Sequence, residues 1–289
     1  MSAPAGTTVG QLLDEAKRRL AAAHVPDPGR EATALVALAL ATDRGGVLVR
    51  KPDAADERAV VRLEALLAAR ERRVPLQHLT GTTEFCGLEL AVGPDALIPR
   101  PETEDLVLRV LELPLPEAAL VADLGTGSGA IAIALSVARP AWRLRAVDLS
   151  LRALGIAAAN AARHGVGDRV SFLHRDFGEV PAGERASCHA VASNPPYVAE
   201  HEWEGLQAEV RDHEPRLALV PGPTGEEAYA SVARAAGALL VPGGWLAFEL
   251  GWKSEAAVRS IVEDAGFVEI EVRPDLGGIP RVLSARWPR

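Results

Sequence analysis

Apolar residues recur every three or four positions in three successive segments at the start of the chain. In the first segment Leu12, Ala16 and Leu20 fall on one face, with Thr8 or Thr7 as the N-cap, as in an amphipathic helix. Short polar links separate this segment from the next two, so the first 75 residues are predicted to form a compact helical bundle. The predicted helices cover residues 9–23, 30–41 and 56–73.

The period changes after residue 75. Residues 76–92 alternate apolar and polar positions around Gly81 and Gly87, which predicts a β-hairpin. We therefore divide the chain into a helical domain at residues 1–75, a hairpin linker at 76–93 and a larger domain at 94–289.

Short apolar strands alternate with helical segments from about residue 117 onward. This alternation predicts an α/β domain with a mostly parallel sheet and helices on both faces. No helix separates the last two strands, so the final strand is predicted to be antiparallel, and Gly243, Gly244 and Gly266 are predicted to end helices or form tight turns. The predicted strands are residues 120–124, 143–148, 169–174, 190–194, 245–250, 267–273 and 281–287, and the predicted helices are 130–138, 151–164, 226–240 and 254–265.

The charge balance argues against a nucleic-acid partner. The net charge is −8, whereas binding through phosphates needs clustered Lys and Arg. Arg70, Arg72, Arg73 and Arg100 can still form a small basic patch, although the first three fit a solvated last helical turn equally well.

The cysteines and the apolar runs indicate a cytoplasmic protein with no membrane partner. Cys86 and Cys188 lack metal-ligand spacing, so we expect no metal site, and their small number fits a reducing compartment. The N-terminus lacks a signal-peptide pattern. The longest apolar run, residues 32–41, is about half of the ~20 residues that a membrane-spanning helix needs.

A glycine-rich turn follows the first strand of the α/β domain. Gly125, Gly127 and Gly129 let the backbone approach a ligand at the positive end of the next helix. The same loop fits the dinucleotide pattern G-x-G-x-x-G/A, and Asp148 follows at about the right distance. By itself the loop therefore leaves open a nicotinamide or flavin site, a site for S-adenosyl-L-methionine (SAM), or a purely structural turn.

Acidic residues at three successive strand ends favour SAM. Asp123 suits a ligand with an ammonium and a sulfonium group, Asp148 can accept both ribose hydroxyls, and Asp176 lies where an adenine amino group would lie. In an open α/β sheet these strand ends share one ligand-binding edge. The predicted cofactor-binding residues are Asp123, Gly125, Thr126, Gly127, Gly129, Asp148, Asp176, Phe177 and Asn194.

The fourth strand ends in Asn-Pro-Pro-Tyr at residues 194–197. The Asn194 side-chain oxygen and a neighbouring carbonyl can accept both hydrogens of a planar NH2 group. The two prolines stiffen the turn, and the aromatic ring can lie against the flat face of an amide or base. The predicted catalytic residues are Asn194, Pro195, Pro196 and Tyr197, and the predicted substrate-binding residues are Asn194, Pro195, Tyr197, Arg100 and Glu102.

With Leu-Ile-Pro-Arg-Pro-Glu-Thr-Glu at residues 97–104, these motifs resemble the HemK/PrmC family over nearly the whole chain. The resemblance implies a class I SAM-dependent methyltransferase, a Rossmann-like fold with a mostly parallel seven-stranded sheet. It also implies an enzyme of translation termination, which methylates the side-chain N5 of the glutamine in the Gly-Gly-Gln motif of class-1 peptide-chain release factors. The abundance of Ala, Arg and Gly with little Lys suggests a bacterial source. Lys253, Ser254 and Pro280 depart from the family pattern, away from the proposed chemistry.

Several assignments stay open at this point. Glu102 and Glu104 can cap a helix that begins near Thr103 or line the substrate entrance, and the helical domain can dock the protein substrate or only stabilise the larger domain. The alternative functions are a ribosomal-protein glutamine methyltransferase, an adenine-N6 methyltransferase of nucleic acids, a nicotinamide-dependent oxidoreductase and a non-catalytic SAM-binding protein.

Overall fold

The computed structural model describes residues 7–288, which divide into two compact units. Unit 1 contains the chain up to Gly81 together with Gln207–His213, and unit 2 contains Thr82–Leu206 and Glu214–Arg289. The chain therefore enters unit 1 a second time, late in the sequence. No pattern in the sequence indicates this return, and the predicted boundary at residue 75 falls just before the short helix that ends unit 1.

Unit 1 is helical, with the three predicted helices present and their ends shifted by a few residues. Thr8 caps the first helix, because its hydroxyl accepts from the Gln11 backbone while the Gln11 side chain accepts from the Thr8 backbone. Leucines from the long helices form the core, among them Leu13, Leu35 and Leu67. The helices of unit 1 are α1 (Val9–Ala22), α2 (Pro28–Ala39), α3 (Arg44–Val49), α4 (Glu57–Glu71), α5 (Leu76–Thr80) and α9 (Ala208–His213).

Two of the three arginines near the end of α4, Arg70 and Arg73, are paired inside unit 1, whereas Arg72 is exposed. Arg70 is only 3% exposed and donates to Glu31 at 2.5 Å and to Glu209 at 2.9 Å. Arg73 donates to the same Glu209 at 2.8 Å. Neither the predicted basic patch nor the solvated helical turn is right for Arg70, because carboxylates from α2 and α9 neutralise it inside the unit.

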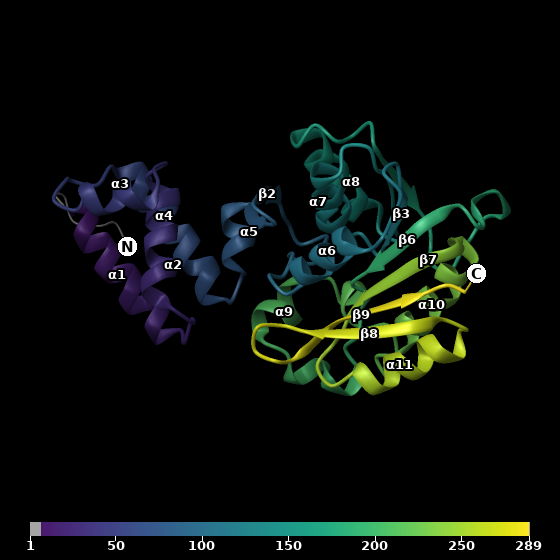
Figure 1. Ribbon diagram of the computed structural model, residues 1–289. Coiled ribbons are helices and arrows are strands. Elements are labelled where there is room, and N and C mark those ends of the chain that lie inside the picture. Colours follow the sequence, from purple (N-terminus) through teal and green to yellow (C-terminus); the bar gives the residue numbers. More distant parts are fainter. Residues whose placement is uncertain (1–6, 289) are drawn as a thin grey trace. The chain divides into compact units, whose positions relative to one another are not determined.

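Unit 2 is a seven-stranded sheet between two helical layers, in the strand order β5-β4-β3-β6-β7-β9-β8 (Figure 1). The pairs from β5 to β7 are parallel, and β9 is antiparallel to both of its neighbours, as predicted. Helices α6, α7 and α8 pack on one face, and α10 and α11 pack on the other. The strands are β3 (Leu120–Leu124), β4 (Arg143–Asp148), β5 (Val170–His174), β6 (Cys188–Ser193), β7 (Leu240–Glu249), β8 (Val268–Pro274) and β9 (Pro280–Arg286), and the helices are α6 (Thr103–Glu112), α7 (Ala130–Ala138), α8 (Leu151–Arg163), α10 (Glu227–Leu239) and α11 (Glu255–Asp264).

A β-hairpin opens unit 2. It pairs β1 (Thr82–Phe85) with β2 (Leu88–Ala91), and the predicted start at residue 76 is replaced by helix α5. Gly81, with φ +77°, ends that helix. Cys86 and Gly87 form the two-residue loop, both with positive φ, which matches the right-handed twist of the paired strands.

The prediction for Gly243 and Gly244 was wrong. Both lie inside β7, whose register with β6 shifts between Cys188 and Ala190. Gly243 has φ +82°, so the two glycines serve a strand irregularity rather than a helix end. Gly266 does follow α11 with φ +92° and donates its N–H to the Glu263 carbonyl, which confirms the helix C-terminus predicted there.

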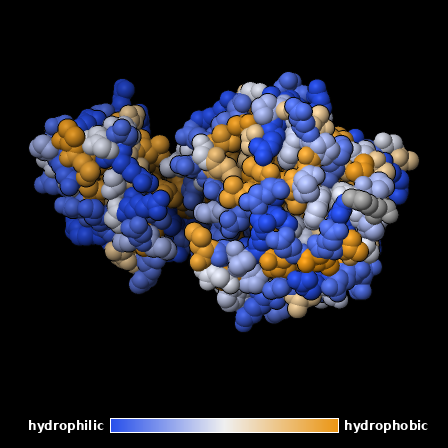
Figure 2. All heavy atoms as spheres, in the orientation of Figure 1, coloured by the Kyte–Doolittle hydropathy of each residue, from blue (hydrophilic) through white to orange (hydrophobic). Residues whose placement is uncertain are grey.

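The surface is mostly hydrophilic on the face that Figure 2 shows, with hydrophobic residues in separate patches. Within the described part of the chain, no helix is long and apolar enough to cross a membrane. The strand order of unit 2 reverses between β3 and β6, and in such sheets ligands bind beyond the carboxyl ends of the strands at that point.

Candidate active site

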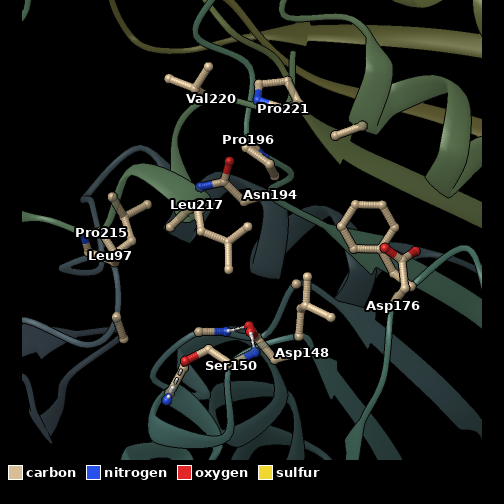
Figure 3. Close-up of a pocket in the computed structure, with 18 of the residues that line it drawn as sticks. Leu97, Asp148, Ser150, Asp176, Asn194, Pro196, Pro215, Leu217, Val220 and Pro221 are labelled. Atoms are coloured by element: carbon tan, nitrogen blue, oxygen red, sulfur yellow. Dashed lines mark hydrogen bonds between the residues drawn. The ribbon is translucent and has the colours of Figure 1, made fainter. Parts of the chain in front are cut away.

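A cleft of about 330 Å³ lies at this edge of the sheet, within unit 2. In Figure 3, Asn194 and Pro196 lie across the cleft from Asp148 and Ser150, and Asp176 stands to one side. Leu97, Pro215 and Leu217 from two loops close the remaining wall. The cleft brings together seven of the residues predicted from the sequence: Gly125, Gly127, Asp148, Asp176, Phe177, Asn194 and Pro196.

The glycine-rich loop has a backbone that only glycine adopts easily. Gly125 and Gly127 have φ +80° and +55° and both line the cleft. Gly129, with φ +85°, is required by packing instead, because a Cβ there would lie 3.0 Å from the Ala157 Cβ and 2.9 Å from Ile133. Thr126 and Gly129 belong to the same loop but do not line the cleft.

Asp148 and Asp176 are held by backbone N–H groups close to them. Asp148 Oδ2 accepts from Gly127 N at 2.8 Å and its Oδ1 accepts from Ser150 N at 2.8 Å. Asp176 Oδ1 accepts from Gly178 N at 2.7 Å. Each carboxylate keeps further acceptor capacity toward the cleft, as a ligand with hydroxyl or amino groups requires.

Asp123 does not line the cleft. It is fully buried beneath the loop, where its Oδ2 accepts from the Thr126 hydroxyl at 2.6 Å and from Ala132 N at 3.2 Å. Burial raises the pKa of Asp123 to about 7, against the effect of these two hydrogen bonds. Its other oxygen, Oδ1, has no hydrogen-bond partner among the described residues.

Asn194 is oriented by side chains from distant parts of unit 2. Its Nδ2 donates to Thr103 Oγ1 at 3.2 Å, and Thr103 in turn donates to Glu249 Oε2 at 2.5 Å. Glu249 is 2% exposed, and burial raises its pKa to about 7. With Nδ2 directed to Thr103, Oδ1 is the amide atom of Asn194 that remains for a ligand.

Pro195 and Tyr197 of the tetrapeptide are packed against other residues and do not line the cleft. A Cβ at Gly251 would lie 2.7 Å from the Tyr197 ring, and a Cβ at Gly225 would lie 2.5 Å from the Tyr197 carbonyl oxygen. Burial raises the pKa of Tyr197 to about 12, so the phenol stays neutral. Pro195 is buried, and of the two prolines only Pro196 lines the cleft.

The Ile-Pro-Arg-Pro-Glu-Thr-Glu segment at residues 98–104 is held in place by Glu214. Arg100 donates to Glu214 Oε1 at 2.5 Å, and Ile98 N donates to its Oε2 at 3.0 Å. Glu104 accepts from Cys86 N at 2.8 Å, so it fixes the hairpin turn instead of capping α6. Glu102 makes no side-chain cap bond at the start of α6, and neither it nor Arg100 lines the cleft.

The sequence reasoning missed three side chains that organise this site, Thr103, Glu214 and Glu249. Glu249 carried a signal, because an acid at the end of the apolar strand 245–250 needs a buried partner. Among residues 7–288 there is no group of three or more His, Cys, Asp or Glu side chains arranged to hold a metal ion.

Comparison with known proteins decides the family. The PrmC N-terminal domain matches residues 11–81, and the methyltransferase small domain matches residues 103–211. A release factor glutamine methyltransferase from Cereibacter sphaeroides is 44% identical over 277 residues, which cover 96% of this chain and 97% of that protein. The chain belongs to the HemK/PrmC family.

A second HemK/PrmC relative and one solved structure agree with this assignment. A release factor glutamine methyltransferase from Moorella thermoacetica is 41% identical over 280 residues, with 96% of this chain and 98% of that protein covered. A methyltransferase from Pyrococcus furiosus has a TM-score of 0.52, covers 70% of this chain and 90% of its own, and is 18% identical. The likeness to the Pyrococcus furiosus structure concerns the fold alone, and it confirms the predicted class I methyltransferase sheet.

The chain is therefore a methyltransferase whose cofactor is SAM, and the residues of the cleft fit that cofactor. SAM carries a cationic sulfonium, an ammonium, a ribose diol and a flat adenine. Carboxylates at Asp148 and Asp176 and the ring of Phe177 line the cleft, and the buried Asp123 has one oxygen without a partner among the described residues. An acidic site with one aromatic wall suits a cationic ligand with a base and a diol.

Proposed function

We propose that this protein methylates the side-chain N5 of the glutamine in the Gly-Gly-Gln motif of class-1 peptide-chain release factors, in the bacterial cytoplasm. The observation that carries the proposal is the fixed orientation of Asn194, whose Oδ1 is available at the cleft wall while Nδ2 is bound to Thr103. The two relatives that match this chain over nearly its whole length are named release factor glutamine methyltransferases, which supports a glutamine of a release factor as the substrate.

The chemistry requires orientation more than acid or base catalysis. An amide nitrogen is a weak nucleophile, because its lone pair is delocalised, and good positioning of two reactants can contribute on the order of 7–11 kcal/mol. Bound SAM supplies a methyl group on an electrophilic sulfonium. The nitrogen loses one proton to solvent after the transfer, so no strong base is needed in the cleft.

Asn194 and Pro195 would act on the nucleophile. As the nitrogen attacks, its N–H bonds become more acidic, so Asn194 Oδ1 and the Pro195 carbonyl accept stronger hydrogen bonds in the transition state than before it. Tyr197 would support the plane of the amide from its packed position on Gly251. Arg100 and Glu102 would contribute to substrate binding from the loop that Glu214 holds.

We propose that unit 1 docks the release factor, because one glutamine offers too little surface for selection. Val49 on α3 and Val61 on α4 are 79% and 66% exposed and give the unit apolar surface for a protein partner. Deleting residues 1–81 would be a poor test, because α9, the part of unit 1 that would remain, would lose the Arg70 and Arg73 partners of its Glu209.

The substrate proposal is tested by peptide mass spectrometry of a purified class-1 release factor after incubation with the protein and SAM. One added methyl group on the Gly-Gly-Gln glutamine is expected, and none on a factor in which that glutamine is alanine. No methylation of the factor would overturn the proposal. Transfer to a ribosomal-protein glutamine or to adenine instead, measured in parallel, would assign the alternative substrate.

The docking proposal is tested by Val49→Ser combined with Val61→Ser. KM for the intact release factor should rise several-fold, while the rate with a short Gly-Gly-Gln peptide stays unchanged. Val268→Ser is the matched control, since Val268 is an exposed valine (44%) of unit 2. Equal KM values for both variants and the wild type would show that unit 1 does not bind the factor through these side chains.

A further inference from the structure

Three side chains that are far apart in the sequence form one hydrogen-bonded chain beside the cleft. Asn194 follows β6, Thr103 begins α6 and Glu249 ends β7. Thr103 and Glu249 are 4% and 2% exposed, so the Thr103–Glu249 hydrogen bond is shielded from water. Only Asn194 among the three lines the cleft.

The donors and acceptors in this series of hydrogen bonds, from Asn194 through Thr103 to Glu249, determine which way the Asn194 amide faces. An ionised carboxylate can only accept, so the single hydroxyl hydrogen of Thr103 is committed to Glu249. The Thr103 oxygen can then only accept from Asn194, which must present Nδ2 to it. The Asn194 Oδ1 is left for the substrate, which needs an acceptor.

We propose that Thr103 and Glu249 are positioning residues, which hold the Asn194 amide so that its oxygen, and not its NH2 group, meets the substrate nitrogen. The inference rests on the proposed role of Asn194 as an acceptor for a glutamine NH2 group. It adds a reason for the enzyme's choice of an NH2-bearing nucleophile, because a reversed amide would repel that group and favour a carbonyl oxygen.

The protonation state of Glu249 controls the orientation of the Asn194 amide. A protonated Glu249 can donate to Thr103, which frees the Thr103 hydroxyl hydrogen for Asn194 Oδ1 and lets the amide reverse. Because burial raises the Glu249 pKa to about 7, the correct orientation is lost as the pH falls below that value. The titratable and charged groups that act on Glu249, or on which it acts, are Arg281, Glu102, Arg100, Tyr197 and Tyr229.

Two substitutions at Thr103 separate the hydroxyl from the shape of the side chain. Thr103→Val keeps the shape and removes the hydroxyl, and it should lower kcat by about tenfold or more, as loss of a fixed transition-state acceptor implies. Thr103→Ser keeps the hydroxyl and should retain kcat within about threefold. The Kd for SAM, from calorimetry, should be the same in both variants and the wild type.

The pH profile distinguishes positioning from simple structural support. For the wild type, kcat at saturating SAM and release factor should rise with pH to a plateau above about 7. Glu249→Gln should be slow at every pH and lack this acid limb, because glutamine can donate to Thr103 permanently. A Glu249→Gln profile with the wild-type shape would overturn the proposal.

Nuclear magnetic resonance of the side-chain amide of Asn194 in the full-length protein without substrate gives a readout independent of turnover. Its two N–H signals should shift with an apparent pKa near 7 in the wild type, and that titration should vanish in Thr103→Val and Glu249→Gln. If the two N–H signals titrate in both variants as they do in the wild type, the positioning role is overturned even if glutamine is methylated. A normal titration with no glutamine methylation would instead refute the proposed substrate and leave the positioning chain intact.

Discussion

The two sides of the cleft are held in opposite ways. On the side proposed to bind the cofactor, Asp148 and Asp176 each accept a hydrogen bond from a backbone group two residues further along the chain, and Asp148 accepts one more from Gly127 N, 21 residues earlier. On the other side, Asn194 donates to Thr103, which lies 91 residues earlier in the sequence, and Thr103 donates to Glu249, which lies 146 residues after Thr103. The proposed cofactor side is thus held by backbone groups of the turns at the strand ends, whereas the acceptor side is held by side chains from distant segments of unit 2.

This contrast separates the effects that substitutions should have. Changes at the local carboxylates should alter SAM affinity and leave the rate of the saturated enzyme nearly intact. Changes at the hydrogen-bonded side chains Asn194, Thr103 and Glu249 should alter the rate of methyl transfer and leave SAM affinity intact.

The largest effect is expected for Asn194→Ala. Removing one acceptor that acts in the transition state should lower kcat by about 10²- to 10³-fold. The Kd for SAM, measured by calorimetry, should stay close to the wild-type value. A parallel loss of SAM affinity would place Asn194 on the cofactor side of the comparison instead.

Asp148→Asn should give the converse result. The substitution removes a charged acceptor from the bonds to Gly127 and Ser150, and hydrogen bonds to charged groups contribute ≈ 1.5–3 kcal/mol. The Kd for SAM should rise by about 10- to 100-fold, with kcat at saturating SAM nearly unchanged. Asp168→Asn, at an exposed acid before β5, is the control and should change neither value.

Gly251→Ala should disturb the acceptor side of the cleft by displacing the Tyr197 ring, which packs against Gly251. The new Cβ would lie 2.7 Å from Tyr197, and overpacking of this kind costs about 1–3 kcal/mol. We expect kcat to fall by about tenfold as the ring moves, and thermal unfolding to occur at a lower temperature. Gly155→Ala is the matched control, because its Cβ meets nothing within 4 Å on helix α8, and it should raise stability slightly.

The smallest effect concerns the pH dependence of SAM binding. Asp123, whose pKa burial raises to about 7, is mostly neutral at pH 6 and mostly ionised at pH 8. A cationic ligand favours the ionised form, so SAM should bind more tightly as the pH rises, by up to about tenfold. Calorimetry of Asp123→Asn should show a flatter dependence; an unchanged slope would mean that Asp123 only supports the loop.

The same contrast explains what could be predicted from the sequence. β3 and β4 begin and end at the predicted residues, because apolar runs and the turns after them are local features. Asp148 was found at its strand end for the same reason.

Apart from the short helix α5, which replaces the predicted start of the hairpin, the failures named here involve contacts between distant segments. The roles of Glu249 and Thr103 follow from the hydrogen bond between them, which joins distant segments. Gly243 was misassigned because β7 begins at Leu240, where it pairs with Cys188 of β6. The return of α9 to unit 1 depends on the bonds between Glu209 and Arg70, which are 139 residues apart. A local pattern can show that the acid at the end of strand 245–250 needs a partner, but it does not show which distant residue that partner is.

The most direct test is the single-turnover rate of methyl transfer to a release factor, with SAM saturating, for the wild type, Asn194→Ala and Asp148→Asn. The account predicts one methyl group on the Gly-Gly-Gln glutamine, a rate at least about 100-fold lower in Asn194→Ala, and a rate close to wild type in Asp148→Asn. Equal rate losses in the two variants at saturating SAM, or transfer to another residue, would contradict it.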